Sequence, residues 1–496
     1  MKARMPHLFY TYASQFSLKS IVLALSGFAM DLIKNQNQGS SCYYAIKHYR
    51  IKHKNSMIRD KVPVYQVNLI DVMYEVVTMD KFGQKAITQD EALYLVHLHV
   101  NLVEERHKRD RKKIDIRLWL EANLGEQTKF QKIKDFFDDY SREKYILEII
   151  GNKEHPKNQI KLDFNKEFSD LTGVSTDHFS FAVFLIYVYF STVSHCIDFE
   201  KILPEEMVFD VSKKTIMDVL KRYSVSVDEI KVSNQKRQTF YLKPILRMGN
   251  EFIAVNPLLL LETFSHSNYW IVRNEHMTRN SQAFINYFGK LFEIYLEEVL
   301  NNCLTKEQYQ NIEESNIEKR ADWLLNIEGY EFFVEQKSSL SLLSIKQSQP
   351  DLEAMKKHIC KVWGKAAKQL AQTEKYYKSN NAIKIILTYE GYYGCTCIDQ
   401  LFKLDSTIVN DGRYWLMSIK EFEEFIFTYK TNPKKFFDVV EKKTIAEKTQ
   451  NLNERGVLIF LKRVGVKRQH YINAFGISGQ FNKIAQTLEM DVENAT

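Results

Sequence analysis

Apolar and polar positions between residues 320 and 339 follow the pattern of two short strands joined by a turn. Residues 323–325 and 330–334 are mostly apolar, and the segment Asn-Ile-Glu-Gly stands between them. Strand-forming runs that flank a short segment ending in glycine are typical of a β-hairpin. We therefore predict a hairpin at the centre of the C-terminal half of the chain.

Three charged side chains lie at one end of this predicted hairpin. Asp322 comes directly before the first strand, and Glu335 and Lys337 end the second strand. Because side chains alternate along a strand, Glu335 and Lys337 share one face. Charges beside an apolar strand pair are costly in free energy unless they are paired or used. This end of the hairpin is therefore the first candidate for a functional site.

An apolar stripe with helical spacing precedes the hairpin. It predicts a helix from about residue 281 to 301, and its members are Phe284, Phe288, Leu291, Phe292, Tyr295 and Val299. Glu293 lies on the flank of that stripe, beside Gly289 and Leu296. Glu293 is therefore a candidate fourth member of the charged group.

After the hairpin the pattern predicts a loop, a second helix and another strand. Residues 341–347 are typical of a loop, a helix follows from 348–351 to about 378, and residues 382–389 form an apolar strand. One side of the helix carries Lys361, Lys365, Lys368, Gln372 and Lys375. The order helix, strands, helix, strand indicates an α/β domain.

The part of the chain before residue 270 is predicted to be mainly helical. Residues 86–120 contain neither glycine nor proline, and the apolar segments 20–30 and 179–193 are too short to span a membrane. We interpret both apolar segments as buried helices. Two short strands are predicted at 240–247 and 252–257, around a turn at Met248-Gly-Asn-Glu251.

The chain is predicted to contain four parts. They are a helical domain at 1–150, a mixed connecting domain with short strands at 151–275, an α/β domain at 276–445 and a small basic helical segment at 446–496. Residues 414–427 predict a strand and a helix that complete the α/β domain. Residues 442–454 predict a polar linker.

Composition places this chain among folded proteins of several domains. Its 496 residues are 45% hydrophobic and 26% charged, and glycine (17) and proline (8) are scarce, which favours long helices. The net charge of +7 permits an anionic partner such as nucleic acid without requiring one. Six cysteines without a CxxC pair predict reduced thiols. We therefore expect a cytoplasmic protein with no membrane segment.

With Asp322 and Glu335-Gln-Lys337 in place, the chain resembles the PD-(D/E)XK nuclease superfamily, also called restriction-endonuclease-like. The resemblance covers about residues 281–390 and extends towards 445. It includes Gly289-Lys-Leu-Phe-Glu-Ile-Tyr295, where many members place a further acidic ligand, and Gln369-Leu-Ala-Gln-Thr-Glu-Lys-Tyr376, which is similar to the glutamine-bearing helix of several members. Ala321 stands where the family name has proline, and the pattern defines no first strand between 304 and 318.

The resemblance implies an α/β multidomain protein. Its C-terminal half would hold a restriction-endonuclease-like core, a mixed sheet flanked by helices, and its N-terminal half would be largely helical. Such nuclease domains often occur in prokaryotic restriction, repair and anti-phage proteins. The resemblance also implies the backbone carbonyl of Gln336 as an oxygen ligand.

The candidate residues have the chemistry that phosphodiester cleavage requires. A hard cation such as Mg²⁺ or Mn²⁺ polarises the phosphoryl group and takes oxygen ligands, usually one or two carboxylates. Asp322 and Glu335 could supply these carboxylates, with Glu293 as a third acidic group. Lys337 could orient water or offset developing charge. The substrate backbone could be held by Gln369, Gln372, Lys365 and Lys368.

We therefore predict a metal-dependent endonuclease that acts on nucleic acid, with DNA favoured. The tripeptide Glu-x-Lys is weak by itself, because Glu229-Ile-Lys231 and Glu441-Lys-Lys443 match it too. The alternative is a non-catalytic nucleic-acid-binding or scaffold protein that keeps a nuclease-like fold. Double-strand cleavage would suggest a homodimer, and the N-terminal half could recruit a partner protein. The basic cluster at 107–113 is either a solvated helix end or a phosphate-contacting patch.

Overall fold

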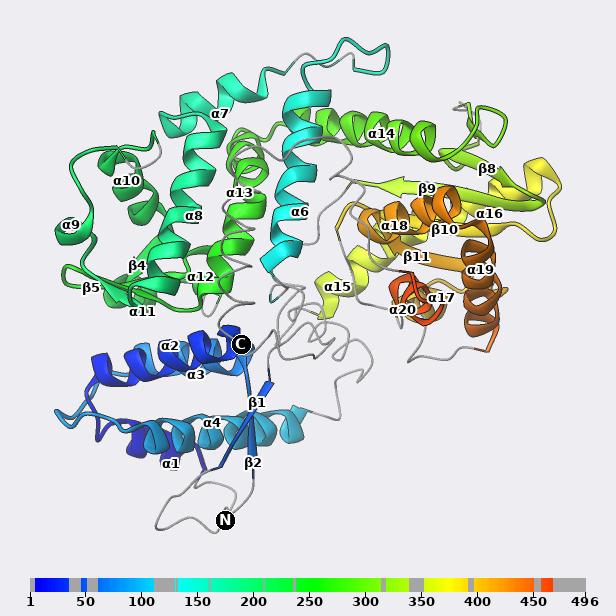
Figure 1. Cartoon of the computed structure of the whole chain (residues 1–496). Coiled ribbons are helices and arrows are strands. Elements are labelled where there is room, and N and C mark those ends of the chain that lie inside the picture. The colour runs from blue at the N-terminus through cyan, green and yellow to red at the C-terminus, as the bar shows by residue number, and fades with distance from the viewer. Residues whose placement is uncertain are drawn as a thin grey trace. The chain divides into compact units, whose positions relative to one another are not determined.

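The computed structural model describes thirteen stretches of the chain and divides it into two compact units (Figure 1). The described residues are 5–34, 46–50, 61–110, 130, 133–158, 160, 162–207, 210–234, 238–313, 318–338, 352–390, 397–449 and 456–466. The first unit comprises Met1–Ile114, Gln127–Tyr140 and Asn165–Ile271. The second comprises Asp115–Glu126, Ser141–Phe164 and Val272–Thr496. Residues 141–164 thus group with the C-terminal half.

The N-terminal half is mainly helical, as predicted from its apolar segments and from the absence of glycine and proline in residues 86–120. Its helices are α1 (Met5–Ala13), α2 (Leu18–Lys34), α3 (Gln66–Val77), α4 (Gln89–Asp110), α6 (Ile133–Lys144), the π-helix η1 (Tyr145–Ile150), α7 (Phe164–Thr172), α8 (Thr176–Thr192), α9 (Phe199–Ile202), α10 (Lys213–Tyr223), α11 (Val227–Val232), α12 (Gln238–Leu242) and α13 (Pro257–Thr278). The predicted apolar helices 20–30 and 179–193 correspond to α2 and α8, whose apolar side chains are largely buried. Both predictions are confirmed.

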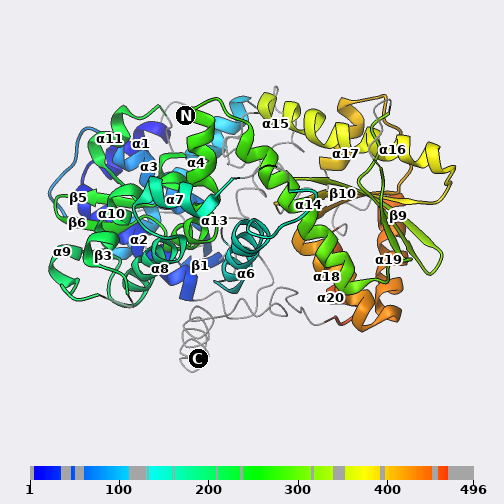
Figure 2. The same cartoon turned by 90° about the horizontal axis from the view of Figure 1, so that it is seen from above.

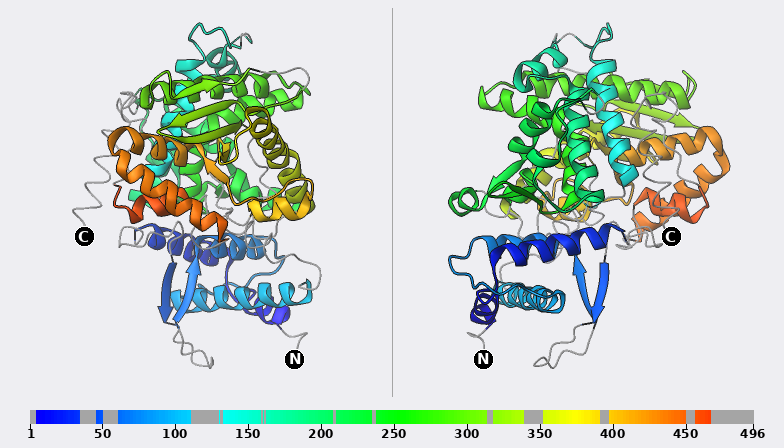
Figure 3. Two further views of the ribbon diagram at one scale, coloured as in Figure 1. Left: turned by 90° about the vertical axis from the view of Figure 1, so that its right-hand side faces the viewer. Right: turned by 60° about the vertical axis from the view of Figure 1, so that its left-hand side comes forward.

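The strands of the N-terminal half form two small sheets. An antiparallel ribbon pairs β1 (Ile46–Arg50) with β2 (Lys61–Tyr65), and no apolar alternation in the sequence had predicted it (Figure 3). A mixed sheet has the order β3-β6-β5-β4, with β3 (Cys196–Ile197), β4 (Ser224–Ser226), β5 (Ile245–Met248) and β6 (Glu251–Ala254).

The first strand predicted in this region is only partly correct. Residues 240–242 belong to α12, with Phe240 and Tyr241 buried, and the strand begins at Ile245. Pro244 between them fixes its backbone φ and has no N–H to continue a helix. The turn before β6 is confirmed, with Gly249 at φ 64°.

The C-terminal half contains a five-stranded mixed sheet packed with helices. Its elements are α14 (Ala283–Cys303), β7 (Tyr309–Asn311), β8 (Trp323–Ile327), β9 (Tyr330–Lys337), α15 (Leu352–His358), the π-helix η2 (Ile359–Gly364), α16 (Lys365–Tyr377), β10 (Ile383–Thr388), α17 (Cys397–Leu404), β11 (Tyr414–Ser418), α18 (Ile419–Thr431), α19 (Pro433–Lys448) and α20 (Val457–Arg463). The strand order is β11-β10-β9-β8-β7. β9, β10 and β11 run parallel, and β7, β8 and β9 are joined antiparallel.

Helices cover both faces of this sheet, because its strands carry apolar side chains on both sides (Figure 2). On one face Phe333 belongs to a buried cluster with Trp363 and Leu370 of η2 and α16. On the other face Phe332 packs against Phe425 of α18 and Phe436 of α19. The sheet is therefore buried on both sides, and polar groups within it need partners.

The predicted hairpin is confirmed as β8 and β9. Its two-residue turn, Glu328 and Gly329, has φ of 47° and 88°, as a type I′ turn requires. The pairing sets Trp323 opposite Val334. The short β7 supplies the first strand that the sequence pattern did not define.

The helix and strand predictions around the hairpin are confirmed by α14, by α15 to α16, by β10, and by β11 followed by α18. The predicted linker at 442–454 is wrong as far as residue 448, because α19 continues through it. Within α19, Lys443 is buried and pairs with Glu447, one helical turn later, at 2.7 Å. The charge-rich sequence is thus part of a packed helix.

Several predictions fall outside the described residues. They are the loop at 341–347, the helix start at 348–351 and the tail beyond residue 466. The side chains of the basic cluster 107–113 are likewise outside them. Within the described part of the chain, no single helix is long and apolar enough to cross a membrane, although α7 and α8, bent by 53°, pass that test of length and composition as a pair.

Candidate active site

The hairpin register brings Asp322 next to the end of β9. The Asp322 backbone N–H donates to the carbonyl of Val334 at 3.1 Å. The backbone N–H of Gln336 in turn donates to Oδ2 of Asp322 at 2.7 Å. The carboxylate of Asp322 is therefore fixed by the strand that carries Glu335 and Lys337, and the three predicted charges form one group, here called the hairpin cluster.

Glu335 is the most enclosed member of the hairpin cluster. Its residue is 2% exposed, and its Oε1 forms an ion pair with Lys337. Its Oε2 is buried and receives no N–H or hydroxyl donor from the described part of the chain, and its carboxyl group lies within hydrogen-bonding reach of the Asp322 carboxyl group. A buried carboxylate oxygen without a donor is costly in free energy, so this atom is suited to a cation or a water.

The hairpin cluster has two carboxyl groups and one ammonium group, and the pKa values of both carboxyl groups are raised. Burial raises the pKa of Asp322 to about 6, although the Gln336 N–H and Lys337 oppose this rise. Burial, followed by the nearby Asp322 carboxylate, raises the pKa of Glu335 to about 8. Two carboxylates that share one ammonium in a dry site cannot both be ionised easily.

Helix α16 is hydrogen-bonded both to Lys337 of β9 and to the segment that precedes Asp322. Lys337 Nζ donates to Oε1 of Gln369 at 3.2 Å, and Nε2 of Gln369 donates to the carbonyl of Arg320 at 3.1 Å. One turn later, the hydroxyl of Thr373 accepts from the backbone N–H of Ala321 at 2.7 Å. Gln369 therefore links the catalytic lysine candidate to the segment that leads into Asp322.

Glu293 of α14 lies close enough to Asp322 to raise its pKa. Its own two oxygens are already paired: Oε1 lies 2.9 Å from Lys157 Nζ and Oε2 lies 3.1 Å from Lys290 Nζ. Burial acts to raise the pKa of Glu293, but these two lysines outweigh it and lower the pKa. Glu293 thus belongs to the surroundings of the hairpin cluster, in a different electrostatic state from Glu335.

The predicted substrate-binding residues lie along α16 beside Gln369. Lys365 is exposed and forms no ion pair with any described residue. Lys368 is already paired with Asp405 at 2.7 Å. Gln372 is half-buried. Of these predicted residues, only Gln369 is hydrogen-bonded to the hairpin cluster.

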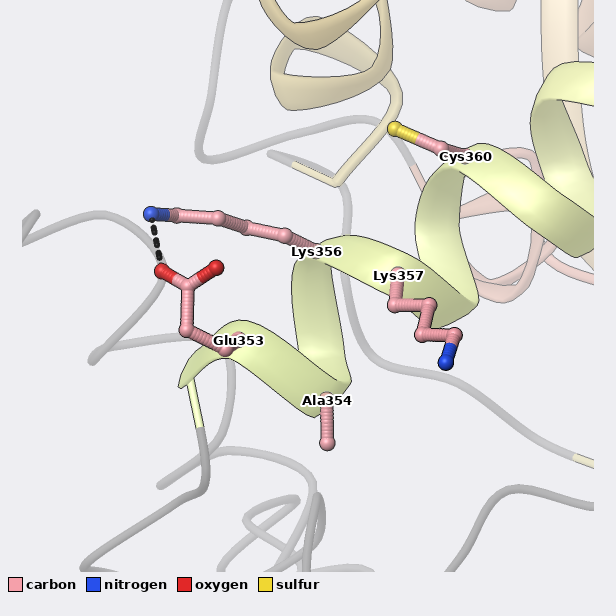
Figure 4. Close-up of a pocket in the computed structure, with 5 residues that line it drawn as sticks. All are labelled: Glu353, Ala354, Lys356, Lys357 and Cys360. Carbon is pink, nitrogen blue, oxygen red and sulfur yellow. Dashed lines mark hydrogen bonds and ion pairs between the residues drawn. The ribbon is translucent and has the colours of Figure 1, made fainter.

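An open hollow of about 510 Å³ lies farther towards the N-terminus of the same helical run, lined by Glu353, Ala354, Lys356, Lys357 and Cys360 (Figure 4). Lys356 is bonded to Glu353 at 2.8 Å, whereas Lys357 points away from that pair (Figure 4). Together with Lys361 and Lys365, Lys357 continues a row of exposed lysines on this side of the helices.

Three contributors to the site were missed by sequence reasoning. Thr373 holds the segment before Asp322. Arg320 stacks its guanidinium 3.5 Å from the ring centroid of Tyr376. Lys157 reaches Glu293 from a segment that the composition marked only as a boundary. Only Thr373 had a usable signal, because it stands one turn after Gln369 on the same helix.

Comparison of the chain with protein-family models, with curated proteins and with solved structures finds no match in any of the three. A search of the described residues finds no group of three or more His, Cys, Asp or Glu side chains that could hold a metal ion. Asp322 and Glu335 form a group of two carboxylates, which is the number that Mg²⁺ commonly takes from a protein.

Proposed function

We propose that this chain is a metal-dependent nuclease, of the PD-(D/E)XK or restriction-endonuclease-like kind, that hydrolyses phosphodiester bonds at the hairpin cluster. The observation that carries the proposal is the buried Oε2 of Glu335, which has no described donor beside a second carboxylate, Asp322. The succession α14, three antiparallel strands, α16 and the parallel β10 supports the same family, since it follows the order that the resemblance implies.

The hairpin cluster fits a hard divalent cation. Asp322 and Glu335 would hold Mg²⁺ or Mn²⁺ through their carboxylates, with the Gln336 carbonyl as a further oxygen and waters completing the coordination. When bound, such an ion would polarise the phosphoryl group and acidify the attacking water. Burial is the main cause of the raised pKa values of both carboxyl groups, and a bound cation would offset it by favouring the ionised carboxylates, which supports this assignment.

The remaining residues of the site have defined tasks in this proposal. Lys337 would offset negative charge that develops on the scissile phosphate. Gln369 keeps the lysine in position, because its carboxamide receives the ammonium and donates to the Arg320 carbonyl. The exposed lysines at 357, 361 and 365 would lie against the phosphate backbone of the substrate, for which we favour DNA.

The direct test incubates the purified full chain with supercoiled plasmid, linear DNA and RNA, each with Mg²⁺, Mn²⁺ or EDTA. We expect cleavage with the metals and none with EDTA, and we expect Asp322→Ala and Glu335→Gln to abolish it. Glu331→Gln is the matched control, because Glu331 lies four residues earlier on β9 and bonds to Ser379 instead of the cluster. It should cleave like the wild type.

Two results would contradict the proposal. Equal behaviour of the wild type and Asp322→Ala on all substrates would remove the nuclease assignment. Tight DNA binding by both proteins without any cleavage would instead favour a non-catalytic nucleic-acid-binding protein with the same fold.

A further inference from the structure

We infer that Lys157 acts as the permanent counter-ion of Glu293 in place of a second divalent cation, and so limits the hairpin cluster to one metal ion. This inference rests on the proposed metal-dependent function and defines its stoichiometry. It assigns a role at the site to the segment 151–158, which lies more than 100 residues before the hairpin in the sequence.

Lys157 is held beside the site by three independent groups. Its ammonium lies 2.9 Å from Oε1 of Glu293 and 3.2 Å from Oε2 of Glu297. It also lies 4.9 Å from the ring centroid of Trp323, the residue that follows Asp322. Two carboxylates and an aromatic face fix one ammonium group far better than a single surface ion pair does. Lys157 is therefore a built part of the site.

The two glutamates near Asp322 differ in whether their carboxylate oxygens are already paired with ammonium groups. Glu335 keeps one buried oxygen without a described donor, whereas each oxygen of Glu293 faces an ammonium group. A divalent cation bound to Oε1 of Glu293 would have to replace Lys157, because the more exposed Lys290 pairs with the other oxygen, Oε2. Glu335 needs no such exchange, so the cation is directed to Glu335 and Asp322.

The indole of Trp323 also favours an ammonium over a metal ion at this position. A lysine ammonium is attracted by the face of an aromatic ring. Mg²⁺ requires six oxygen ligands in nearly octahedral geometry and keeps several of its waters. An indole face offers no oxygen ligand and leaves no partner for those waters, so the position that Lys157 occupies suits an organic cation.

The test counts bound Mn²⁺ on the full chain by electron paramagnetic resonance. We expect the wild type to bind one Mn²⁺ and Asp322→Asn to bind none. Lys157→Met, which removes the charge but keeps an apolar stem over Trp323, should bind one additional Mn²⁺. Adding Glu293→Gln to Lys157→Met should remove the additional ion. Lys157→Arg should bind as the wild type does.

The matched control is Lys153→Met, because Lys153 comes from the same segment and pairs with the neighbouring Glu298 at 2.8 Å. It should leave the stoichiometry unchanged. The inference is overturned if Lys157→Met binds only one Mn²⁺. It is also overturned if the wild type shows the spin-coupled spectrum of two Mn²⁺ ions about 4 Å apart, a result that needs no variant to fold. Absence of any Mn²⁺ that depends on Asp322 would instead refute the proposed function itself.

Discussion

Two clusters of charged side chains lie at opposite ends of β10, and they are balanced very differently. Near the start of the strand, Lys384 and Arg413 meet Glu374 and Asp411, a group here called the balanced cluster. Lys384 Nζ lies 2.8 Å from Glu374 and 2.5 Å from Asp411, and Arg413 pairs with the same two carboxylates. At the other end stands the hairpin cluster, where two carboxylates share one lysine.

The pKa values express this difference. In the balanced cluster burial acts to raise the pKa of Asp411, but Lys384 and Arg413 outweigh it and lower the pKa. In the hairpin cluster burial wins, and the pKa of Glu335 rises to about 8. Partly buried charge is thus common to both ends of the strand. Two cations offset burial in the balanced cluster, whereas the single lysine of the hairpin cluster does not, which makes the hairpin cluster the better candidate for chemistry.

The comparison predicts opposite outcomes for the same substitution. Asp322→Asn should lower nuclease activity by about 10³-fold, because it removes a carboxylate that would hold the metal ion, and with that ion the positive charge that would stabilise the transition state. Asp411→Asn should leave the activity of the folded protein within about threefold of wild type and should lower its stability, because Lys384 and Arg413 lose one partner. Plasmid cleavage and urea unfolding of both variants measure the two effects. Equal activity losses would show that the two clusters do not differ in role.

The free energy of unfolding should depend more on the balanced cluster than on the hairpin cluster, the reverse of the order expected for activity. Lys384→Met should lower the free energy of unfolding by about 3 kcal/mol, because it leaves Glu374 and Asp411 with one cation in a largely buried site. Glu335→Gln, measured without metal, should be neutral or stabilising, because it removes the carboxylate that burial disfavours most in the hairpin cluster. Urea unfolding in EDTA compares them. A loss of stability in Glu335→Gln as large as that in Lys384→Met would mean that the hairpin cluster is a structural ion pair.

The sequence predicted the hairpin cluster but not the balanced one, and the reason is distance along the chain. Asp322 and Glu335 stand at the open end of two strands that a two-residue turn joins, so the antiparallel pairing of these neighbouring strands brings them together. Glu374, Lys384 and Arg413 come from α16, β10 and the loop before β11, and only the parallel register unites them. The same limit hid Lys157, because no local pattern indicates that its segment reaches α14.

The fold was predictable where local patterns were strong. The apolar stripe of α14, the short turn of the hairpin and the mostly apolar run of β10, in which Lys384 is the one charged residue, each predicted their element. The linker prediction at 442–454 failed because charge density was interpreted as exposure, whereas Lys443 is buried with Glu447 in α19. Charge density alone therefore does not indicate exposure, because a pair spaced i,i+4 on a helix is buried at Lys443 and Glu447 and exposed at Lys166 and Asp170.

The pH dependence of stability should separate the two clusters without any activity measurement. In the unfolded chain Asp and Glu lose their protons near pH 4, whereas folded Asp322 and Glu335 keep theirs to about pH 6 and about pH 8. Between about pH 4 and about pH 8 the folded state therefore binds more protons than the unfolded chain. The stability that these protons contribute falls as the pH rises and is lost above about pH 8.

In EDTA we expect the free energy of unfolding to fall on the order of 5 kcal/mol from about pH 5 to about pH 9, because Glu335 accounts for about three pKa units in this range and Asp322 for about one, at about 1.4 kcal/mol each. Mg²⁺ should reduce this fall, because the ion favours the ionised carboxylates. The double variant Asp322→Asn/Glu335→Gln should largely lose the fall, and Asp411→Asn should keep it. A flat profile for the wild type would show that the hairpin cluster is not short of positive charge.

The smallest expected effect concerns cations on the surface of α16, where the same distinction between paired and unpaired charge applies. Lys365 forms no ion pair with a described residue, whereas Lys368 already pairs with Asp405. A lysine that neutralises one phosphate contributes about 0.9 to the slope of log affinity against log salt. Lys365→Ala should therefore reduce that slope by about 0.9, and Lys368→Ala by clearly less, because Asp405 competes for its charge. DNA binding of the Asp322→Asn protein, measured at several salt concentrations, tests this. Equal slopes for both alanine variants would mean that DNA displaces Asp405 from Lys368, and that pairing at this surface does not protect a lysine from the substrate.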